Sequence, residues 1–179
     1  MPAGPTRLRR LPTHELSPVQ RDDVLALCAE AYEEDLSPYF DWIGPGLHLL
    51  LHEGDTLVSH LMLVERQLQP EGYPLLRTGY VELVATRPAR QGQGFASALL
   101  RAVTDDLEAF DLGALSPSDA AFYERLGWES WRGALWVRTA AGMEPTPDEE
   151  VMIRRTVRTP SPLTLSLPLS VEWRPGEVW

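Results

Sequence analysis

A glycine-rich turn at residues 91–96, Gln-Gly-Gln-Gly-Phe-Ala, has a composition and spacing suited to ligand binding. Gly92 and Gly94 carry no side chain, so a ligand can approach the backbone closely, and Ala96 keeps the next turn small. A helix that begins at Phe95 would point its first backbone N–H groups, and its positive end, toward that space. Converging N–H groups bind phosphate oxygens, so the pattern predicts a phosphate-binding turn.

A purely structural interpretation of this turn is a tight connection between a strand and a helix. The turn lacks the Lys-Ser or Lys-Thr pair of a P-loop and the third glycine of a dinucleotide-binding fingerprint. Residues 80–86 mix aromatic and β-branched side chains without a helical period, which predicts a buried strand. After the turn, apolar residues recur at helical spacing and predict a helix with one apolar face: Phe95, Leu99, Leu100, Val103, Leu107 and Phe110.

Two further residues could move protons. Glu82 lies inside the apolar strand, where a carboxylate is costly unless it faces solvent or has a function. Tyr123 follows Phe122 and precedes Leu126 on a short predicted helix. Its phenol is either a core side chain or a proton donor, since an ordinary pKa of about 10 allows both.

The composition predicts a single globular domain spanning residues 1–179. Hydrophobic residues make up 44% and charged residues 23%, and the net charge is −10. This balance argues against nucleic acid and anionic membrane as partners, and it favours a cationic small molecule. The single cysteine, Cys28, excludes an internal disulfide, and we see no signal peptide or membrane span, so we expect a cytoplasmic protein. Residues His48, His52 and His60 lack metal-ligand spacing, and no metal site is predicted.

The remaining pattern predicts an α/β fold in which helices flank a mixed central sheet of about seven strands. Helices are expected from Ser17 to about Glu33 and over residues 118–126. The acidic, aromatic residues 33–42 are either a solvated loop or a surface for a sugar or polyamine. The other strands are expected at residues 6–11, 47–52, 57–69, 111–116, 128–137 and 151–157, with an edge strand at 160–168 and an acidic loop at 143–150.

The turn resembles the coenzyme A pyrophosphate loop of the GNAT superfamily of N-acetyltransferases, whose pattern is Gln/Arg-x-x-Gly-x-Gly/Ala. Gln91, Gly94 and Ala96 fit that pattern, and the strand before and the helix after give its required context. The resemblance implies the GNAT fold and acetyl-CoA as cofactor. It assigns cofactor binding to Val84, Ala85, Thr86, Gln91, Gly92, Gln93, Gly94, Phe95 and Ala96.

Three later segments, LGALSPSDAAFYERLGW, TPDEE and EWRPGEVW, are similar to the aminoglycoside 2′-N-acetyltransferases, a likeness that runs from about residue 35 to the end. It implies acetyl transfer to an amine of a polycationic aminosugar, and a homodimer. The sequence departs from the family at Glu149 and Glu177, where aspartate is favoured, and in a shorter interval between Ser116 and Tyr123. An extra methylene displaces a carboxylate by about one C–C bond, which alters its contacts.

The resemblance also implies roles for individual residues. Glu82 would act as base on the acceptor amine through water, an N–H near Val84 would polarise the thioester carbonyl, and Tyr123 would protonate the leaving thiolate. The resemblance assigns acceptor binding to Asp35, Glu82, Leu83, Ser116, Asp148, Glu149, Glu177 and Trp179. Two alternatives stay open: a GNAT enzyme acting on another polyamine, peptide amine or amino sugar, and an inactive acyl-CoA-binding module.

The end of the chain allows two interpretations. A turn at Pro175-Gly176 could fold the terminus into the acceptor cleft, where the Trp179 carboxylate and Glu177 would bind ammonium groups and the Trp179 ring a sugar face. Alternatively, Trp173 and Trp179 seal the core.

Overall fold

The computed structural model describes residues 5–179 and divides into two compact units. The first unit comprises residues 5–64 and 81–104, and the second comprises residues 65–80 and 105–179. Strands β3 (Thr56–Pro70) and β4 (Leu76–Thr86) each contribute residues to both units.

The first unit is built on antiparallel strands β1 (Thr6–Pro12) and β2 (Gly46–Glu53) with the first half of β3. Leu8 pairs with Leu51 and Leu49 with Leu61, and Gly54 at φ +59° makes the β2–β3 turn. The second half of β4 lies beside β3, where the Arg87 N–H bonds the Val58 carbonyl at 3.0 Å. The two strands that the sequence predicted at residues 47–52 and 57–69 are confirmed.

Helix α1 (Pro18–Tyr32) begins as its sequence predicts. The Ser17 hydroxyl accepts the Gln20 N–H at 3.2 Å, the Gln20 side chain accepts the Ser17 N–H at 2.9 Å, and Pro18 occupies the first helical turn. Of the two alternatives for residues 33–42, the solvated loop is partly wrong, because Ser37–Trp42 form a short helix, α2. Burial of Phe40, which is 5% exposed, accounts for this turn of helix.

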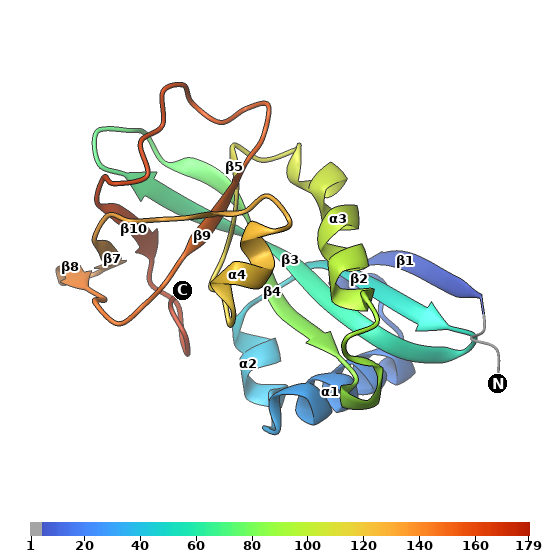
Figure 1. Cartoon of the computed structure of the whole chain (residues 1–179). Helices are drawn as coiled ribbons and strands as arrows, with labels where there is room; N and C mark the ends of the chain where they lie inside the picture. Colours follow the sequence, from blue (N-terminus) through green and yellow to red (C-terminus); the bar gives the residue numbers. More distant parts are fainter. Residues whose placement is uncertain (1–4) are drawn as a thin grey trace. The chain divides into compact units, whose positions relative to one another are not determined.

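The predicted strand, turn and helix follow as β4, the 3-10 turn η2 (Pro88–Arg90) and α3 (Phe95–Leu107). Helix α3 ends before Phe110, whose N–H bonds the Leu107 carbonyl at 2.9 Å. Figure 1 shows α1 and α2 on one side of the first unit's strands and α3 on the other.

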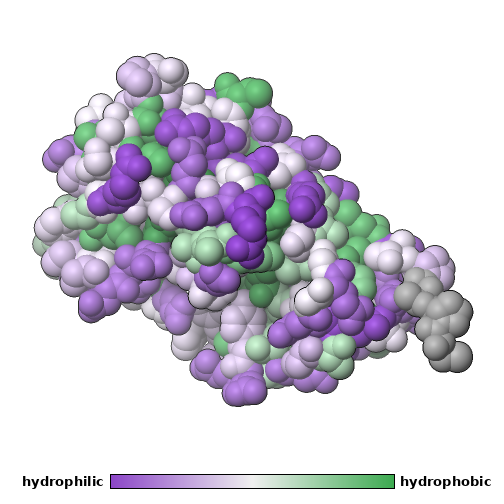
Figure 2. Space-filling model, viewed as in Figure 1, coloured by the Kyte–Doolittle hydropathy of each residue, from purple (hydrophilic) through white to green (hydrophobic). Residues whose placement is uncertain are grey.

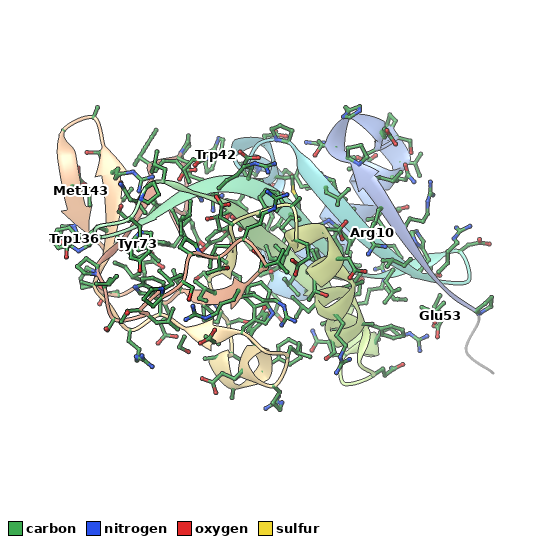
Figure 3. All side chains as sticks on the ribbon, turned by 90° about the horizontal axis from the view of Figure 1, so that it is seen from above. Arg10, Trp42, Glu53, Tyr73, Trp136 and Met143 are labelled. Atoms are coloured by element: carbon green, nitrogen blue, oxygen red, sulfur yellow. The ribbon has the colours of Figure 1, made fainter. Side chains whose placement is uncertain are left out.

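The second unit contains a mixed sheet in the order β6-β9-β5-β4-β3-β10-β7-β8. Its strands beyond β3 and β4 are β5 (Leu112–Leu115), β6 (Glu129–Ser130), β7 (Leu135–Thr139), β8 (Gly142–Pro145), β9 (Met152–Arg155) and β10 (Leu169–Glu172). The β4–β5 and β10–β7 pairs are parallel, and the β3–β10, β5–β9, β6–β9 and β7–β8 pairs are antiparallel. Trp136 and Met143 mark the β7–β8 hairpin in Figure 3.

Several strand boundaries predicted from the sequence are wrong. The described residues form ten strands rather than about seven. Residues 128–137 split into β6 and β7, because the chain between them bonds elsewhere: the Arg132 and Gly133 N–H groups both reach the Leu165 carbonyl. A Cβ on Gly133 would lie 1.8 Å from the Leu167 carbonyl oxygen, so the two segments touch backbone to backbone.

The expected edge strand at residues 160–168 is absent from the described structure, and β10 begins directly after it. Pro160, Pro162 and Pro168 supply no N–H for a strand ladder. The helix expected at residues 118–126 is shorter, α4 (Ala120–Glu124), with Asp119 at its N-cap and Gly127 at φ +86° after it. The acidic loop predicted at 143–150 is a strand, β8, in its first part.

The surface in Figure 2 is mostly hydrophilic on the visible face, with apolar side chains in small patches. Within residues 5–179, no helix has the length and apolar character needed to cross a membrane. The same residues contain no group of three or more His, Cys, Asp or Glu side chains placed to hold a metal ion.

Candidate active site

The second half of β4 carries the proposed base. Glu82 is 7% exposed, and its Oε2 accepts a hydrogen bond from the Tyr39 hydroxyl of α2 at 2.9 Å. This hydrogen bond orients the carboxylate. The next residue, Leu83, has φ +50°. Among the described residues other than glycine, Leu83 and Glu33 are the two with a positive φ. The strand is therefore locally distorted directly beside Glu82.

Side chains of the first unit hold the backbone that follows. The Tyr32 hydroxyl donates to the Val84 carbonyl at 3.1 Å, and the Ser59 hydroxyl donates to the Ala85 carbonyl at 2.8 Å. Ser59 Oγ also lies 2.8 Å from Thr86 Oγ1. These bonds fix the backbone over the three residues predicted to bind the cofactor.

The glycine-rich turn is open on its ligand side. Gly92 and Gly94 have φ values of +73° and +84°, and a Cβ built on either would meet nothing within 4 Å. The Gln91 amide reaches back to the Thr86 carbonyl at 3.3 Å, which closes the turn. Helix α3 then starts at Phe95, and its thirteen residues give the positive end that an anion requires. The turn therefore fits a diphosphate.

The flanks of this turn are partly covered. Phe95 and Ala96 are half-buried, whereas Gln93 is exposed. The Arg90 guanidinium lies 5.8 Å from the centroid of the Phe95 ring and forms an ion pair with Glu53. The Arg90 charge beside the turn is therefore balanced by Glu53.

Asp35 has a local structural role at the start of α2. Its Oδ1 accepts the Ser37 hydroxyl at 2.6 Å and the Ser37 N–H at 2.9 Å. These bonds hold the pKa of the Asp35 carboxyl below its ordinary value. The side chain is exposed and stays ionised.

In the second unit, Tyr123 lies on α4 and is 5% exposed. Burial raises the pKa of its phenol, a hydrogen bond with Ser118 opposes the shift, and the charge of Asp119 adds to it. The Phe122 and Tyr123 rings meet edge to face with centroids 5.1 Å apart. Ser116, directly after β5, is exposed.

Carboxylates from two distant segments of the second unit lie close enough to interact. The pKa of Glu149 is raised first by partial burial, then by the negative charge of Glu177 and that of Asp148. Like charges gathered in this way raise a carboxyl pKa and form a site that attracts cations. The structure thus brings together three of the predicted acceptor-binding residues.

The end of the chain combines features of both sequence interpretations. Trp179 is 2% exposed, and its indole N–H donates to Thr146 Oγ1 at 2.8 Å, whereas Trp173 is 58% exposed. The open sugar-binding ring expected for Trp179 is therefore wrong, because the indole packs inside the second unit. Gly176 has φ +75°, which confirms the predicted turn. Glu177 after it is exposed.

A pocket of about 500 Å³ lies beside the acidic loop of the second unit. Its lining residues include Glu149, Glu150, Trp131 and Pro117. Thr146, the partner of Trp179, is also in its wall. The pocket therefore combines an aromatic side chain with carboxylates.

A family model described as an acetyltransferase (GNAT) domain matches residues 13–131, which is more than half of the chain. The chain belongs to the GNAT acetyltransferase family. It is therefore an N-acetyltransferase that uses acetyl-CoA, and the family predicted from the glycine-rich turn is confirmed.

Named relatives of this acetyltransferase agree with that assignment. An aminoglycoside 2′-N-acetyltransferase from Mycolicibacterium fortuitum is 36% identical over 180 residues, which covers 96% of this chain and 91% of that protein. Among solved structures, the GNAT family N-acetyltransferase YhbS from Escherichia coli in complex with CoA has a TM-score of 0.63 at 17% identity, covering 97% of this chain and 92% of that one. A GNAT family acetyltransferase from Brucella melitensis in complex with acetyl-CoA has a TM-score of 0.54 at 17% identity, covering 69% and 82%. The GNAT fold predicted from the sequence is confirmed.

Sequence reasoning missed three residues that contact the second half of strand β4 in this acetyltransferase. Tyr39 and Tyr32 donate to Glu82 and Val84, and His60 Nδ1 lies 3.1 Å from the Leu83 carbonyl oxygen. Tyr39 belongs to the acidic, aromatic segment that the sequence did mark as a possible binding surface. Nothing in the spacing of Tyr32 or His60 distinguishes them from core residues, since each contact joins segments far apart in the chain.

Proposed function

We propose that this acetyltransferase transfers the acetyl group of acetyl-CoA to the 2′-amino group of an aminoglycoside. The 36% identity to the Mycolicibacterium fortuitum enzyme over 96% of the chain is the observation that carries the proposal. Within the second unit, the grouping of Glu149, Glu177 and Asp148 supports it, because an aminoglycoside presents several ammonium groups.

Electrostatics favours such an acceptor. The raised pKa of Glu149 means that its charge is held at a cost, and a bound ammonium group would remove that cost. The net charge of −10 would also accelerate the approach of a polycation at low ionic strength. Asp35 and Ser116 are further polar contacts in this proposal, and Leu83 would contribute apolar surface.

Glu82 is the proposed base. An ammonium group has no lone pair, so the attacking amine must first lose a proton to a carboxylate, directly or through a water molecule. Tyr39 holds Oε2 of Glu82 at 2.9 Å and so fixes the direction of the carboxylate. When bound, acetyl-CoA supplies the acetyl group as a thioester, which is reactive toward a neutral amine.

The backbone after Glu82 would hold the donor. We assign Val84, Ala85 and Thr86 to the pantetheine arm, and the turn from Gln91 through Gly92, Gln93 and Gly94 to Phe95 and Ala96 to the diphosphate. The Val84 N–H is proposed to donate to the carbonyl oxygen as negative charge develops on it. Bonds from Tyr32 and Ser59 to this strand keep it in one position without further rearrangement.

Tyr123 is proposed to give its proton to the departing thiolate. Burial raises its pKa, so the phenol is fully protonated at neutral pH, as a donor must be. The same apolar surroundings raise the pKa of a thiolate that leaves beside it, which keeps the transfer favourable.

The acceptor is tested by thiol release from acetyl-CoA with pairs of aminoglycosides that differ only in a 2′-amine or a 2′-hydroxyl. We expect turnover with the 2′-amines and a background rate with their hydroxyl partners, and we expect NMR of the product to show acetyl at N2′. Equal turnover within a pair, or turnover only with linear polyamines or peptide amines, would contradict the proposal.

Three broader expectations accompany this function. We propose one cooperatively folding domain, a homodimer and a cytoplasmic enzyme that confers aminoglycoside resistance. Light scattering of the purified protein checks the dimer, and a single calorimetric transition checks cooperative folding. Growth of a susceptible bacterium that expresses the chain, at rising aminoglycoside concentration, checks resistance, with Glu82→Gln as the inactive control.

A further inference from the structure

Two buried histidines lie side by side in the first unit and have no part in the chemistry above. His48 on β2 and His60 on β3 are each 0% exposed, and their ring centroids are 5.2 Å apart. His48 Nδ1 lies 2.9 Å from His60 Nε2. Burying an imidazole costs free energy unless each ring nitrogen has a hydrogen-bond partner. The partners of the two rings therefore indicate their structural role.

The contact with the Leu83 carbonyl selects one placement of protons along the two rings. The Leu83 carbonyl can only accept, so His60 Nδ1, at 3.1 Å, must carry the proton and donate. His60 Nε2 is then bare and accepts from His48 Nδ1–H. His48 Nε2 is bare in turn and accepts the Thr13 hydroxyl at 3.0 Å.

The surroundings of this chain of bonds keep both rings neutral. Thr13 Oγ1 also accepts the Gly46 N–H at 2.9 Å, which fixes the position of the oxygen, and the Gly46 carbonyl at 3.1 Å is a second acceptor for its proton. Cys28 Sγ lies 4.0 Å from His60 Nδ1, and the Phe40 ring stacks on His48 with centroids 5.5 Å apart. Burial lowers the pKa of both rings, to about 4 for His48 and about 3 for His60.

The carbonyl that receives this bond belongs to the distorted residue of β4. Leu83, at φ +50°, adopts a left-handed conformation that is unfavourable for an L-residue with a large side chain. It stands between Glu82, the proposed base, and Val84, the proposed N–H donor. The dihedral angles of Leu83 therefore set the direction of the Val84 N–H relative to the Glu82 carboxylate.

We infer that His60, oriented by His48 and Thr13, is a positioning residue for acetyl transfer: its Nδ1–H bond to the Leu83 carbonyl holds the β4 distortion that aims the Val84 N–H. This inference rests on the proposed role of Val84. If the oxyanion donor is displaced, stabilisation of the transition state falls much more than the binding affinity for acetyl-CoA.

Two amide substitutions separate this role from simple packing. Asparagine places its amide nitrogen near the position of His Nδ1, and glutamine places its amide near Nε2. His60→Asn can thus keep the bond to Leu83, whereas His60→Gln loses it while retaining a polar group toward His48. We expect His60→Gln to lower kcat by about tenfold or more with the acetyl-CoA KM changed by less than about twofold, and His60→Asn to stay within about threefold of the original kcat.

The rate is measured as thiol release with an active acceptor and as slow hydrolysis of acetyl-CoA without one. The hydrolysis arm needs no aminoglycoside, so failure of the proposed acceptor does not affect it. His14→Gln, at an exposed histidine, is the matched control. Equal losses of rate in the Asn and Gln variants, or full activity in both, would overturn the inference.

A direct measurement covers the case in which a variant does not fold. Long-range ¹H–¹⁵N spectra of the unaltered protein report which nitrogen of each imidazole carries the proton. We expect the Nδ1–H form at both His48 and His60. An Nε2–H form at His60 would mean that no proton points at Leu83, and it would exclude the positioning role whatever the enzyme acetylates.

Discussion

The Tyr39 hydroxyl and the Glu82 carboxylate lie 2.9 Å apart and join helix α2 to the distorted part of strand β4. Glu82 is almost fully buried, so this bond both orients the carboxylate and lowers the cost of its charge. The acidic, aromatic segment before β2 is thus tied to the proposed base through one tyrosine.

Removing this hydroxyl should impair proton transfer more than binding. We expect Tyr39→Phe to lower kcat by about tenfold while the KM for acetyl-CoA stays within about twofold, because a bond to a charged group contributes about 1.5–3 kcal/mol. Steady-state kinetics measures both constants. Tyr73→Phe, which removes a hydroxyl that bonds the Pro162 carbonyl, is the control and should leave kcat unchanged.

Cofactor affinity should depend on the charge and bulk at Gly94. The Gly94→Ala variant adds a Cβ into open space at φ +84°, so we expect a folded protein with a modest rise in the acetyl-CoA KM. The Gly94→Asp variant adds a negative charge where the diphosphate would bind, and its coenzyme A affinity should fall about a hundredfold or more. Calorimetric titration with coenzyme A compares the two, and similar affinities would refute the phosphate-binding turn.

The charge of Glu149 should lower the stability of the folded protein while it strengthens acceptor binding. Its pKa is raised in the folded protein, so the folded state binds the proton more tightly than the unfolded state and is penalised as pH rises through that pKa. At pH 7 the Glu149→Gln variant should therefore melt slightly higher, with a gain below about 1 kcal/mol because the side chain is partly solvated. Its acceptor KM should rise, and added salt should raise that KM less than in the original enzyme.

The neighbouring Glu150 supplies the control for this effect. The charges that raise the Glu149 pKa are those of Glu177 and Asp148, so Glu150→Gln should not raise the melting temperature. A lower melting temperature for Glu149→Gln would contradict the assigned cause of the shift.

The buried histidine pair should make the protein sensitive to acid. The folded-state pKa values, about 4 for His48 and about 3 for His60, lie below the ordinary value of about 6.5. Stability from the neutral rings is therefore fully present above pH 6.5 and is lost as pH falls toward 4, by at most about 1.4 kcal/mol per pH unit for each ring. Urea unfolding between pH 7 and 4.5 should show a shallower loss for His60→Asn, and His14→Gln should follow the original curve.

The elements whose conformation depends on neighbouring residues in the chain could be predicted from the sequence. Serine before proline predicted the start of α1, and Gly92 and Gly94 after an apolar strand predicted the turn into α3. In these cases the residues that determine the conformation are the residues that adopt it. The family, the fold and the acetyl-CoA cofactor followed from that one turn and its flanks.

Contacts between distant segments were decided only by the tertiary structure. The prolines of 160–168 looked compatible with an edge strand, but this segment bonds the backbone near Gly133 and splits the strand expected there. Trp179 could face a sugar or the core by its type alone, and its bond to Thr146 places it inside. The distortion at Leu83 and the histidine chain behind it leave no local pattern, because their stabilising partners lie on Thr13, β2 and β3.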